Sequence, residues 1–444
     1  MTGQEPPTLV AVPELRQSLT LTHATAMVVG TIIGASIFVQ PSEITRQMPS
    51  VSGIILAWIG AGLLTICGAL VCAELASAFP RTGGVYVFLK EAYSPAVGFL
   101  WGWAMLWSMH SGIIAAIATV FARYLAFFIP LSDFGLRAAA VGLVVTLSVV
   151  NWLGVRYGAV VQTVFTGAKI LAIAAIVVAG IFWPSPANQQ LASAARDVTA
   201  RGFVLAMAAG LFAYGGWHMV TYTAGETKRA ASTIPRALLF GTLIVTACYA
   251  GLNAIYLRVL PLDAVRASTH VAADAADRLF GGGGARLMAA LVVISTFGAV
   301  NGIILVGPRV YYSMARDGLL FKWLGEVHPT HRTPHYALAA QALVASALAA
   351  TNTYGALFSR VIYTEWIFFA AMAAGVFVLR RRASYQPAYR APGYPVLPAL
   401  FILVSIIIVI TQVAANPLDS AIGLGLVLAG LPVYFLWSKH RRTG

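Results

Sequence analysis

Acidic residues, cysteines and catalytic motifs are all scarce in this chain. Only 15 of the 444 residues are Asp or Glu, against 29 Lys or Arg, and charged residues make up 10%. The three cysteines, Cys67, Cys72 and Cys248, lie within apolar stretches, so we predict no structural disulfide. There is no CxxC or HExxH spacing, no Walker A loop and no GxSxG. The sequence therefore gives no reason to expect an enzyme, a metal site or a cofactor.

Apolar residues are abundant instead. They make up 59% of the chain, and the mean hydropathy is +0.80, which predicts an all-α polytopic membrane protein. Many apolar stretches exceed the roughly 18–20 residues that cross a hydrocarbon core of about 30 Å. The polar N-terminus lacks the pattern of a cleavable signal peptide. Twelve spans are predicted, near residues 19–46, 51–79, 95–129, 135–154, 158–183, 201–225, 236–259, 285–315, 336–352, 358–380, 395–414 and 417–437.

The distribution of basic residues predicts the orientation. An even number of spans places both termini on one side of the bilayer. If that side is the cytoplasm, most Lys and Arg residues fall in cytoplasmic loops, as the positive-inside rule requires. The same residues are scattered over many loops rather than gathered on one soluble face, so we expect the partner to be the lipid bilayer and not a nucleic acid.

Two of the predicted spans contain small, flexible residues at their centres. The first carries VVGTIIGASIFVQ at 28–40, with Gly30, Gly34 and Ser36, and the sixth carries LFAYGGWHMVTY at 211–222, with Gly215 next to Gly216. Interrupted segments at matching positions of two halves indicate a transporter binding site at the bilayer midplane. The spacing favours two five-span units inserted in opposite orientations.

A broken helix exposes backbone groups that a substrate can use. The N–H groups that begin its second half suit a carboxylate, and the C=O groups that end its first half suit an ammonium group. An α-amino acid carries both. For the first span alone, the alternative is that Gly30 and Gly34 form a GxxxG packing motif. The paired glycines of the sixth span favour the ligand site.

Several motifs resemble one transporter family. GTIIGASIFVQP is similar to the first-helix signature, usually GxIIGxGIFxxP, of the L-amino acid transporters, a branch of the amino acid–polyamine–organocation superfamily. CAELASAFPRTGGVYVFLKEAY, FAYGGWHMVTYTAGE and STFGAVNGIILVGPRVYYSMARDGLLF resemble the second, sixth and eighth spans of that family. The resemblance implies a LeuT-type 5+5 inverted repeat followed by two additional C-terminal helices. It also implies alternating-access transport of L-amino acids by a bacterial-type permease of the inner (plasma) membrane.

The resemblance also divides the chain. The first repeat is expected at 19–183, with its first span broken near 33–36, and the second at 201–382, with the sixth span broken near 213–217. A cytoplasmic tail at 1–18, an external loop at 184–200, the last two spans at 383–438 and a tail at 439–444 complete the division.

By resemblance, the substrate carboxylate meets backbone N–H groups at Gly34, Ala35 and Ser36, and its ammonium group meets carbonyls at Ile32 and around the second break. The whole expected substrate site comprises Ile32, Ile33, Gly34, Ala35, Ser36, Phe212, Ala213, Gly215, Trp217 and His218. The chain departs from the family at Ser36, where Gly is usual, and at His218, where Asn is frequent. Both departures concern substrate preference.

Two ionisable residues lie inside predicted spans. Lys169 resembles the lysine that replaces a bound sodium ion by joining the first and eighth spans, with Ser295 as a partner; the alternative is a lysine that snorkels to an interface. Glu365 is a candidate for coupling or selectivity; the alternative is a charge near an external helix end, because Arg360 is close in sequence. We interpret His110 as a packed, hydrogen-bonding residue rather than a proton carrier.

These observations predict a sodium-independent exchanger or facilitator of neutral L-amino acids. The alternative is a proton-coupled symporter, or a carrier of cationic amino acids or polyamines. A channel or receptor is disfavoured because the chain has neither a filter-like repeat nor a large soluble domain. Relatives that need a heavy subunit attach it through a cysteine in the external loop after the third span. The corresponding loop here, IPLSDFGLR, has none, so we expect no obligatory heavy-chain subunit.

Overall fold

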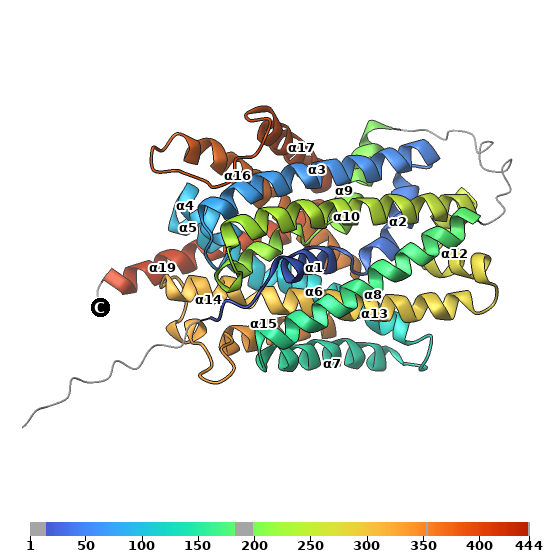
Figure 1. Cartoon of the computed structure of the whole chain (residues 1–444), viewed down its shortest axis with the longest axis horizontal. Coiled ribbons are helices and arrows are strands. Elements are labelled where there is room, and N and C mark those ends of the chain that lie inside the picture. The colour runs from blue at the N-terminus through green and yellow to red at the C-terminus, as the bar shows by residue number, and fades with distance from the viewer. Residues whose placement is uncertain (1–14, 183–198, 352–353, 443–444) are drawn as a thin grey trace, which may run out of the picture.

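The protein is an elongated bundle of helices. The computed structural model describes residues 15–182, 199–351 and 354–442, and their side chains except at 354–363 and 438–442. Most helices run along the longest axis of the molecule (Figure 1). In chain order they are α1 (Leu21–Ile32), α2 (Ser36–Gln47), α3 (Val51–Ala78), α4 (Val85–Ala92), α5 (Pro95–Ala104), η1 (Met105–Met109), α6 (His110–Leu125), α7 (Asp133–Trp152), α8 (Val155–Phe182), α9 (Ala200–Ala213), η2 (Trp217–Glu226), α10 (Ala230–Val259), α11 (Leu262–Ala267), α12 (Val271–Phe280), α13 (Gly284–Val306), α14 (Pro308–Arg316), η3 (Lys322–Gly325), α15 (His335–Thr351), α16 (Tyr354–Arg380), α17 (Val396–Ala415), α18 (Pro417–Leu428) and α19 (Gly430–Arg442).

The lengths of these helices suit a membrane. Within the described residues, nine helical segments are long and apolar enough to cross a bilayer, and the bent pair α1 and α2 forms a tenth. Helix α15 is apolar but shorter. The chain is therefore a multi-pass membrane protein.

Four of the helices begin with a side-chain cap. The hydroxyl groups of Ser50, Ser94, Ser132 and Thr199 accept hydrogen bonds from backbone N–H groups in the first turns of α3, α5, α7 and α9.

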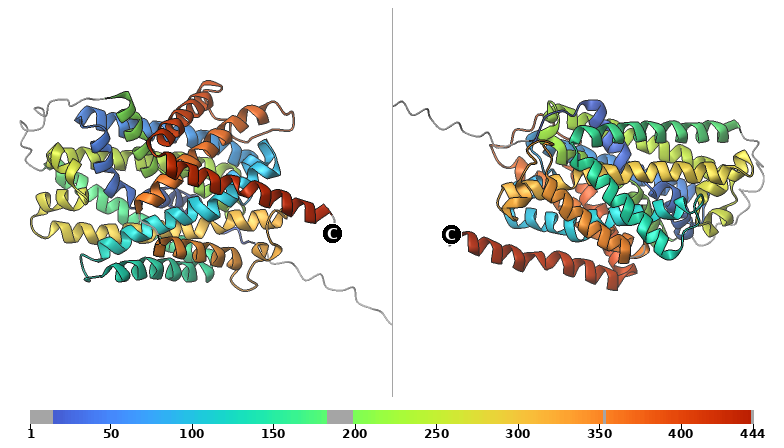
Figure 2. Two further views of the ribbon diagram at one scale, coloured as in Figure 1. Left: turned by 180° about the vertical axis from the view of Figure 1, so that it is seen from behind. Right: turned by 90° about the horizontal axis from the view of Figure 1, so that it is seen from below.

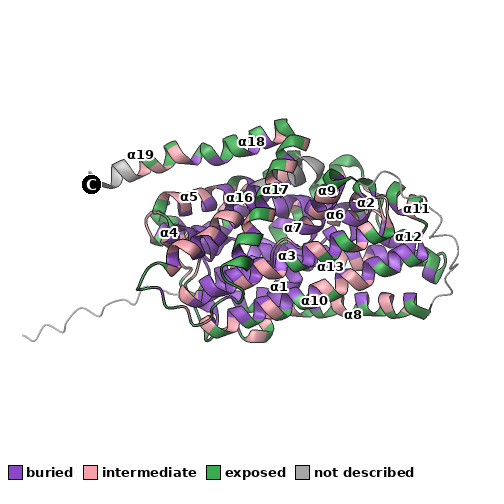
Figure 3. Cartoon of the chain, turned by 90° about the horizontal axis from the view of Figure 1, so that it is seen from above, coloured by how far each residue is buried: buried purple, intermediate pink, exposed green. Residues whose placement is uncertain are grey.

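Burial separates central from peripheral helices. In the most apolar 18-residue window of each helix, 78% of the residues are buried in Pro95–Leu125 and 72% in Gly284–Arg316. The buried share is only 28% in α8 and 22% in Pro417–Trp437. Exposed residues accordingly cover α18 and α19 at the edge of the bundle (Figure 3). Figure 2 shows the same two helices running along the outside. Ala200–Glu226, with 67% buried, joins Pro95–Leu125 and Gly284–Arg316 at the centre of the bundle.

One end of the bundle is held together by buried polar contacts. The Glu226 carboxylate on η2 accepts two hydrogen bonds from the Arg309 guanidinium, at 2.8 and 3.0 Å. The segment before α1 joins the same end, because the backbone N–H groups of Ser18 and Leu19 donate to the Glu226 carbonyl oxygen at 2.9 and 3.0 Å. The Lys228 N–H donates back to the Leu19 carbonyl oxygen at 2.9 Å.

Candidate functional site

The first membrane segment is interrupted near its middle. Helix α1 ends at Ile32, α2 begins at Ser36, and their axes differ by 43°. The Gly34 N–H donates a hydrogen bond to the Ile32 carbonyl oxygen at 2.8 Å. Among the described residues, no group accepts a hydrogen bond from the backbone N–H of Ala35 or Ser36. The start of α2 therefore offers two donors and the positive end of a helix dipole inside the protein.

A second interruption faces the first. Helix α9 ends at Ala213 and η2 begins at Trp217. Gly216 between them has φ of +101°, a conformation that favours glycine, and a Cβ atom there would lie 3.1 Å from the Thr31 carbonyl oxygen. The Thr31 hydroxyl lies 3.2 Å from the Gly216 carbonyl oxygen, although its nearest acceptor is the Met27 carbonyl oxygen at 2.7 Å. The two breaks, far apart in sequence, are therefore in direct contact.

Tyr249 on α10 joins the two breaks. Its hydroxyl lies 3.0 Å from the carbonyl oxygen of Ile32 and 2.9 Å from that of Ala213. A hydroxyl has one proton to donate, so the two carbonyls compete for it. The sequence analysis did not name this residue. The available signal was general: a tyrosine inside an apolar span needs a buried partner for its hydroxyl.

Lys169 reaches the same region from α8. Its side chain is 1% exposed, and its ammonium group donates to the carbonyl oxygens of Gly30 at 3.1 Å and Ile33 at 2.6 Å. The Ser295 hydroxyl on α13 approaches the carbonyls of Ile33 at 3.4 Å and Gly34 at 3.3 Å. Burial to this degree is incompatible with a side chain that snorkels to an interface. Lys169 and Ser295 thus converge on the end of α1.

His218 and Glu365 form a separate buried pair. They are 0% and 4% exposed, and Nε2 of His218 lies 3.8 Å from Oε1 of Glu365. The His218 ring packs against the rings of Phe369 and Trp101, with centroids 4.7 and 5.8 Å away. The position of Glu365 is inconsistent with a charge at an exposed helix end; the Arg360 side chain lies outside the described residues. Trp217 is likewise buried, whereas Phe212 is half-buried.

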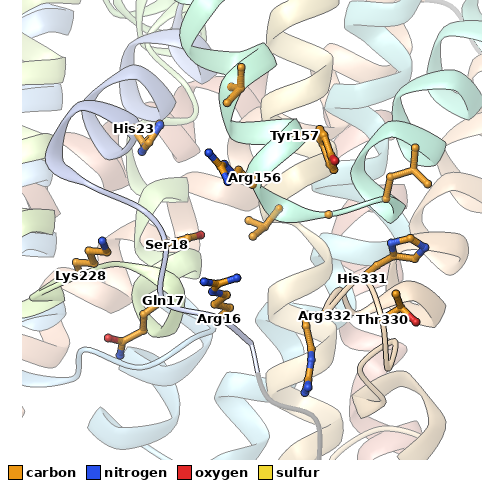
Figure 4. Close-up of a pocket in the computed structure, with 14 residues that line it drawn as sticks. Arg16, Gln17, Ser18, His23, Arg156, Tyr157, Lys228, Thr330, His331 and Arg332 are labelled. Carbon is orange, nitrogen blue, oxygen red and sulfur yellow. The ribbon is translucent and has the colours of Figure 1, made fainter.

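The cavity drawn in Figure 4 lies elsewhere. Its volume is about 640 Å³, and it contains none of the residues expected at the substrate site. Arg16, Arg156, Lys228 and Arg332 line it without any acidic residue, from the segment before α1, the start of α8 and two loops. At the two breaks, Gly34, Ala35 and Gly216 are buried, whereas Phe212 and Gly215 keep partial exposure.

A membrane bundle with two facing helix breaks at its centre has the architecture of a secondary transporter. The amino acid permease family model matches residues 19–434. The serine/threonine exchanger SteT of Bacillus subtilis (strain 168) is 33% identical over 434 residues, covering 97% of this chain and 98% of the relative. The human large neutral amino acids transporter small subunit 2 is 31% identical over 95% of this chain and 80% of its own length. The human b(0,+)-type amino acid transporter 1 is 28% identical over 99% and 91%. This chain belongs to the amino acid permease family, whose members are transporters and not enzymes.

Proposed function

We propose that this permease is a sodium-independent carrier that exchanges neutral L-amino acids, or lets them pass down a gradient, by alternating access. The observation that carries this proposal is the contact between the two helix breaks. It brings unpaired backbone N–H groups and carbonyl oxygens together in the protein interior, where a zwitterion can satisfy both kinds of group.

The proposed pose follows from those groups. The substrate carboxylate binds the N–H groups of Gly34, Ala35 and Ser36, for which Gly34 releases its bond to the Ile32 carbonyl. The ammonium group binds carbonyl oxygens at the ends of α1 and α9. The residues assigned to this ammonium site are Ile32, Phe212, Ala213 and Gly215, while Ile33, whose carbonyl binds Lys169, belongs to the wall of the substrate site. While the site is empty, the Tyr249 hydroxyl lies within hydrogen-bonding distance of the Ile32 and Ala213 carbonyl oxygens. When substrate binds, one of these two oxygens accepts from the substrate ammonium instead.

The side-chain pocket is proposed to be small. Ser36 is 7% exposed and occupies the floor where the carboxylate binds, and Trp217 and His218 are enclosed by other side chains. The relatives' names describe exchange of serine and threonine and transport of large neutral amino acids. Neutral substrates are common to both names, and the crowded site favours the smaller ones.

The absence of a sodium requirement is proposed from Lys169. An ammonium group that binds carbonyls at the end of α1, beside Ser295 on α13, supplies a fixed positive charge where a coupling cation would otherwise join these helices. A carrier with this built-in charge needs no sodium to assemble its closed state.

The larger architecture is proposed as twelve spans, in a 5+5 inverted repeat of residues 19–183 and 201–382 with two further spans at 383–438. Each proposed half begins with a broken segment, α1–α2 and α9–η2, which supports the repeat, and the exposure of α18 and α19 supports a peripheral role for the last spans. Basic loops support cytoplasmic termini in a plasma membrane. The cysteine-free loop before α7 supports a carrier that works as a single chain, without a heavy subunit.

The test is amino acid exchange by the purified chain in liposomes. Liposomes preloaded with unlabelled serine are given labelled neutral, acidic or cationic amino acids, or a polyamine, with sodium or with potassium as the only cation. Uptake of neutral amino acids that ignores sodium is expected; dependence on preloaded substrate identifies exchange, and uptake without it that stops at equal concentrations identifies passage down a gradient. A sodium requirement, or preference for acidic amino acids, would refute the proposal. Activity that appears only after adding a second protein would refute the single-chain assignment.

A second candidate is a proton-coupled symporter or a carrier of cationic substrates. The observation in its favour is the buried carboxylate of Glu365. Competition by lysine, arginine or polyamines in the same assay separates the cationic version from the neutral one.

A further inference from the structure

The cavity in Figure 4 collects positive charge from four separate parts of the chain. Arg16 belongs to the segment before α1, Arg156 to the first turn of α8, Lys228 to the connection between η2 and α10, and Arg332 to the loop before α15. Within the described part of the chain, none of these four side chains makes an ion pair or a hydrogen bond. A hollow lined by charges of one sign concentrates ions of the opposite sign.

Basic residues elsewhere in the structure do have acidic partners. The Lys90 ammonium group lies 2.6 Å from the Asp317 carboxylate, and Arg309 is paired with Glu226 at 2.8 Å. The cations of the cavity differ from these, because the described residues that line the cavity include no Asp or Glu. Their charge is therefore left for a ligand or for solvent ions to balance.

The cavity also presents hydrogen-bond donors that carry no charge. The Ser18 hydroxyl oxygen belongs to its wall, is buried, and has no partner among the described residues. The backbone N–H groups of Val155 and Arg156 begin the 28-residue helix α8 and likewise have no acceptor there. The positive end of the dipole of this long helix lies at the same place. Cations, a hydroxyl group and free N–H groups together suit the oxygens of a phosphate group.

Backbone contacts hold the wall of the cavity in place. Arg332 has φ of +57°, a left-handed conformation that is uncommon for a residue with a Cβ atom and occurs preferentially at functional positions. Its N–H donates to the His328 carbonyl oxygen at 2.9 Å. The next residue, Thr333, donates through its hydroxyl to the Trp152 carbonyl oxygen at 2.9 Å, which joins this loop to the end of α7. The cations therefore project from a fixed frame.

One wall of the cavity continues into the exposed apolar face of α8. Tyr157 and Val160, which line the cavity, are 65% and 48% exposed. Val164 and Leu171, further along the same helix, are 62% and 73% exposed. The spacing of three, four and seven residues places these side chains on one face of the helix. In a bilayer this face contacts acyl chains, so the cavity lies where a lipid headgroup and its tails can both be accommodated.

We propose that the cavity binds the phosphate headgroup of an anionic phospholipid, whose acyl chains lie along the exposed face of α8. Basic pockets between membrane helices recognise such headgroups. A bound headgroup connects the segment before α1 to the start of α8 and to the loop at 330–332, so it stabilises this arrangement of the bundle. The inference does not depend on the amino acid that is carried; only the assignment to the cytoplasmic leaflet rests on the orientation proposed above.

The test is thermal unfolding of the purified full chain in an uncharged detergent. Short-chain phosphatidylglycerol, phosphatidylcholine of the same chain length and water-soluble glycerol phosphate are titrated separately. We expect phosphatidylglycerol alone to raise the unfolding temperature. An equal rise with glycerol phosphate would assign the cavity to a soluble phosphate compound and overturn the lipid assignment. No rise with phosphatidylglycerol, or an equal rise with phosphatidylcholine, would overturn the proposal. No transport is measured, so either failure leaves the proposed carrier function intact.

A set of variants locates the bound lipid. The cavity variant combines Arg16→Gln, Arg156→Gln and Arg332→Gln. Because each basic group near a headgroup contributes a similar share of the attraction, the phosphatidylglycerol concentration that gives half of the effect should rise about a hundredfold. The matched control removes three exposed basic residues outside the cavity, by Arg316→Gln, Lys322→Gln and Arg381→Gln, and should respond as wild type. A wild-type response of the cavity variant, or an equal loss in the control, would overturn the assignment. The comparison of the two lipids on wild-type protein decides whether an anionic headgroup is bound, even if the cavity variant fails to fold.

Discussion

The Lys169 ammonium group lies 2.6 Å from the carbonyl oxygen of Ile33, the first residue after α1. No carboxylate among the described residues neutralises it, so the cost of burying the charge is met by backbone carbonyls and nearby dipoles. The end of α1 is therefore fixed by a charge that belongs to α8.

Replacing Lys169 tests whether that charge is part of transport. Lys169→Ala should reach the membrane but lose most exchange activity, because the end of α1 is no longer tied to α8 and the balance between inward-open and outward-open states shifts. Added sodium should not restore activity. Exchange is measured with equal amounts of protein in liposomes, and the exposed Lys322→Ala is the matched control. Wild-type rates for Lys169→Ala would show that this lysine is only a tolerated buried charge.

Tyr249→Phe tests the hydroxyl that joins the two breaks. The ring should stay in place, because it packs against Trp58 with centroids 5.5 Å apart. Loss of one buried hydrogen bond, worth about 1–1.5 kcal/mol, should reduce exchange about tenfold if the bond stabilises a state on the transport cycle. The rate and the apparent affinity for serine are measured together. An unchanged rate and affinity would contradict a role for this hydroxyl beyond packing.

Gly34→Val tests close approach to the first break. A Cβ atom at Gly34 would lie 3.3 Å from the Cβ of Ala299 and 3.6 Å from a methyl group of Ile117, so the two further methyl groups of valine have little room. Uptake should be abolished while expression and membrane insertion are largely kept. Gly142→Val is the control, because nothing lies within 4 Å of a Cβ atom at that position. Normal uptake by Gly34→Val would mean that the break serves packing alone.

Arg309→Met tests the buried pair with Glu226. Removing one partner leaves the other charge buried, which costs about 3–5 kcal/mol, so the thermal unfolding temperature in detergent should fall sharply. The double variant Arg309→Met with Glu226→Leu should recover much of that loss. Arg46→Met, which breaks the exposed pair with Glu43, should change stability by no more than about 1 kcal/mol. A double variant as unstable as Arg309→Met would contradict this account.

The sequence predicts the parts of this structure that depend on local composition. Long apolar runs predict the helices. Gly34 and Gly216 lie just after the ends of α1 and α9, because glycine destabilises a helix locally. Lys169 could be assigned an interior partner because a charge in an apolar span needs one. Tyr249 and His110 could not be assigned in the same way. Their neighbours are distant in sequence, and only the packing of several helices decides which of many buried polar groups meet.

The hydrogen bonds between Leu19 and the backbone around Thr227 also impose an order of assembly. Leu19 is synthesised about two hundred residues before its partners, so the ribosome must extend the chain through Lys228 before these bonds can form. Until then, the N–H groups of Ser18 and Leu19 remain available to water or to other proteins at the translocation machinery. The segment before α1 is thus among the first parts to be made, yet it docks only after more than half of the chain has been synthesised.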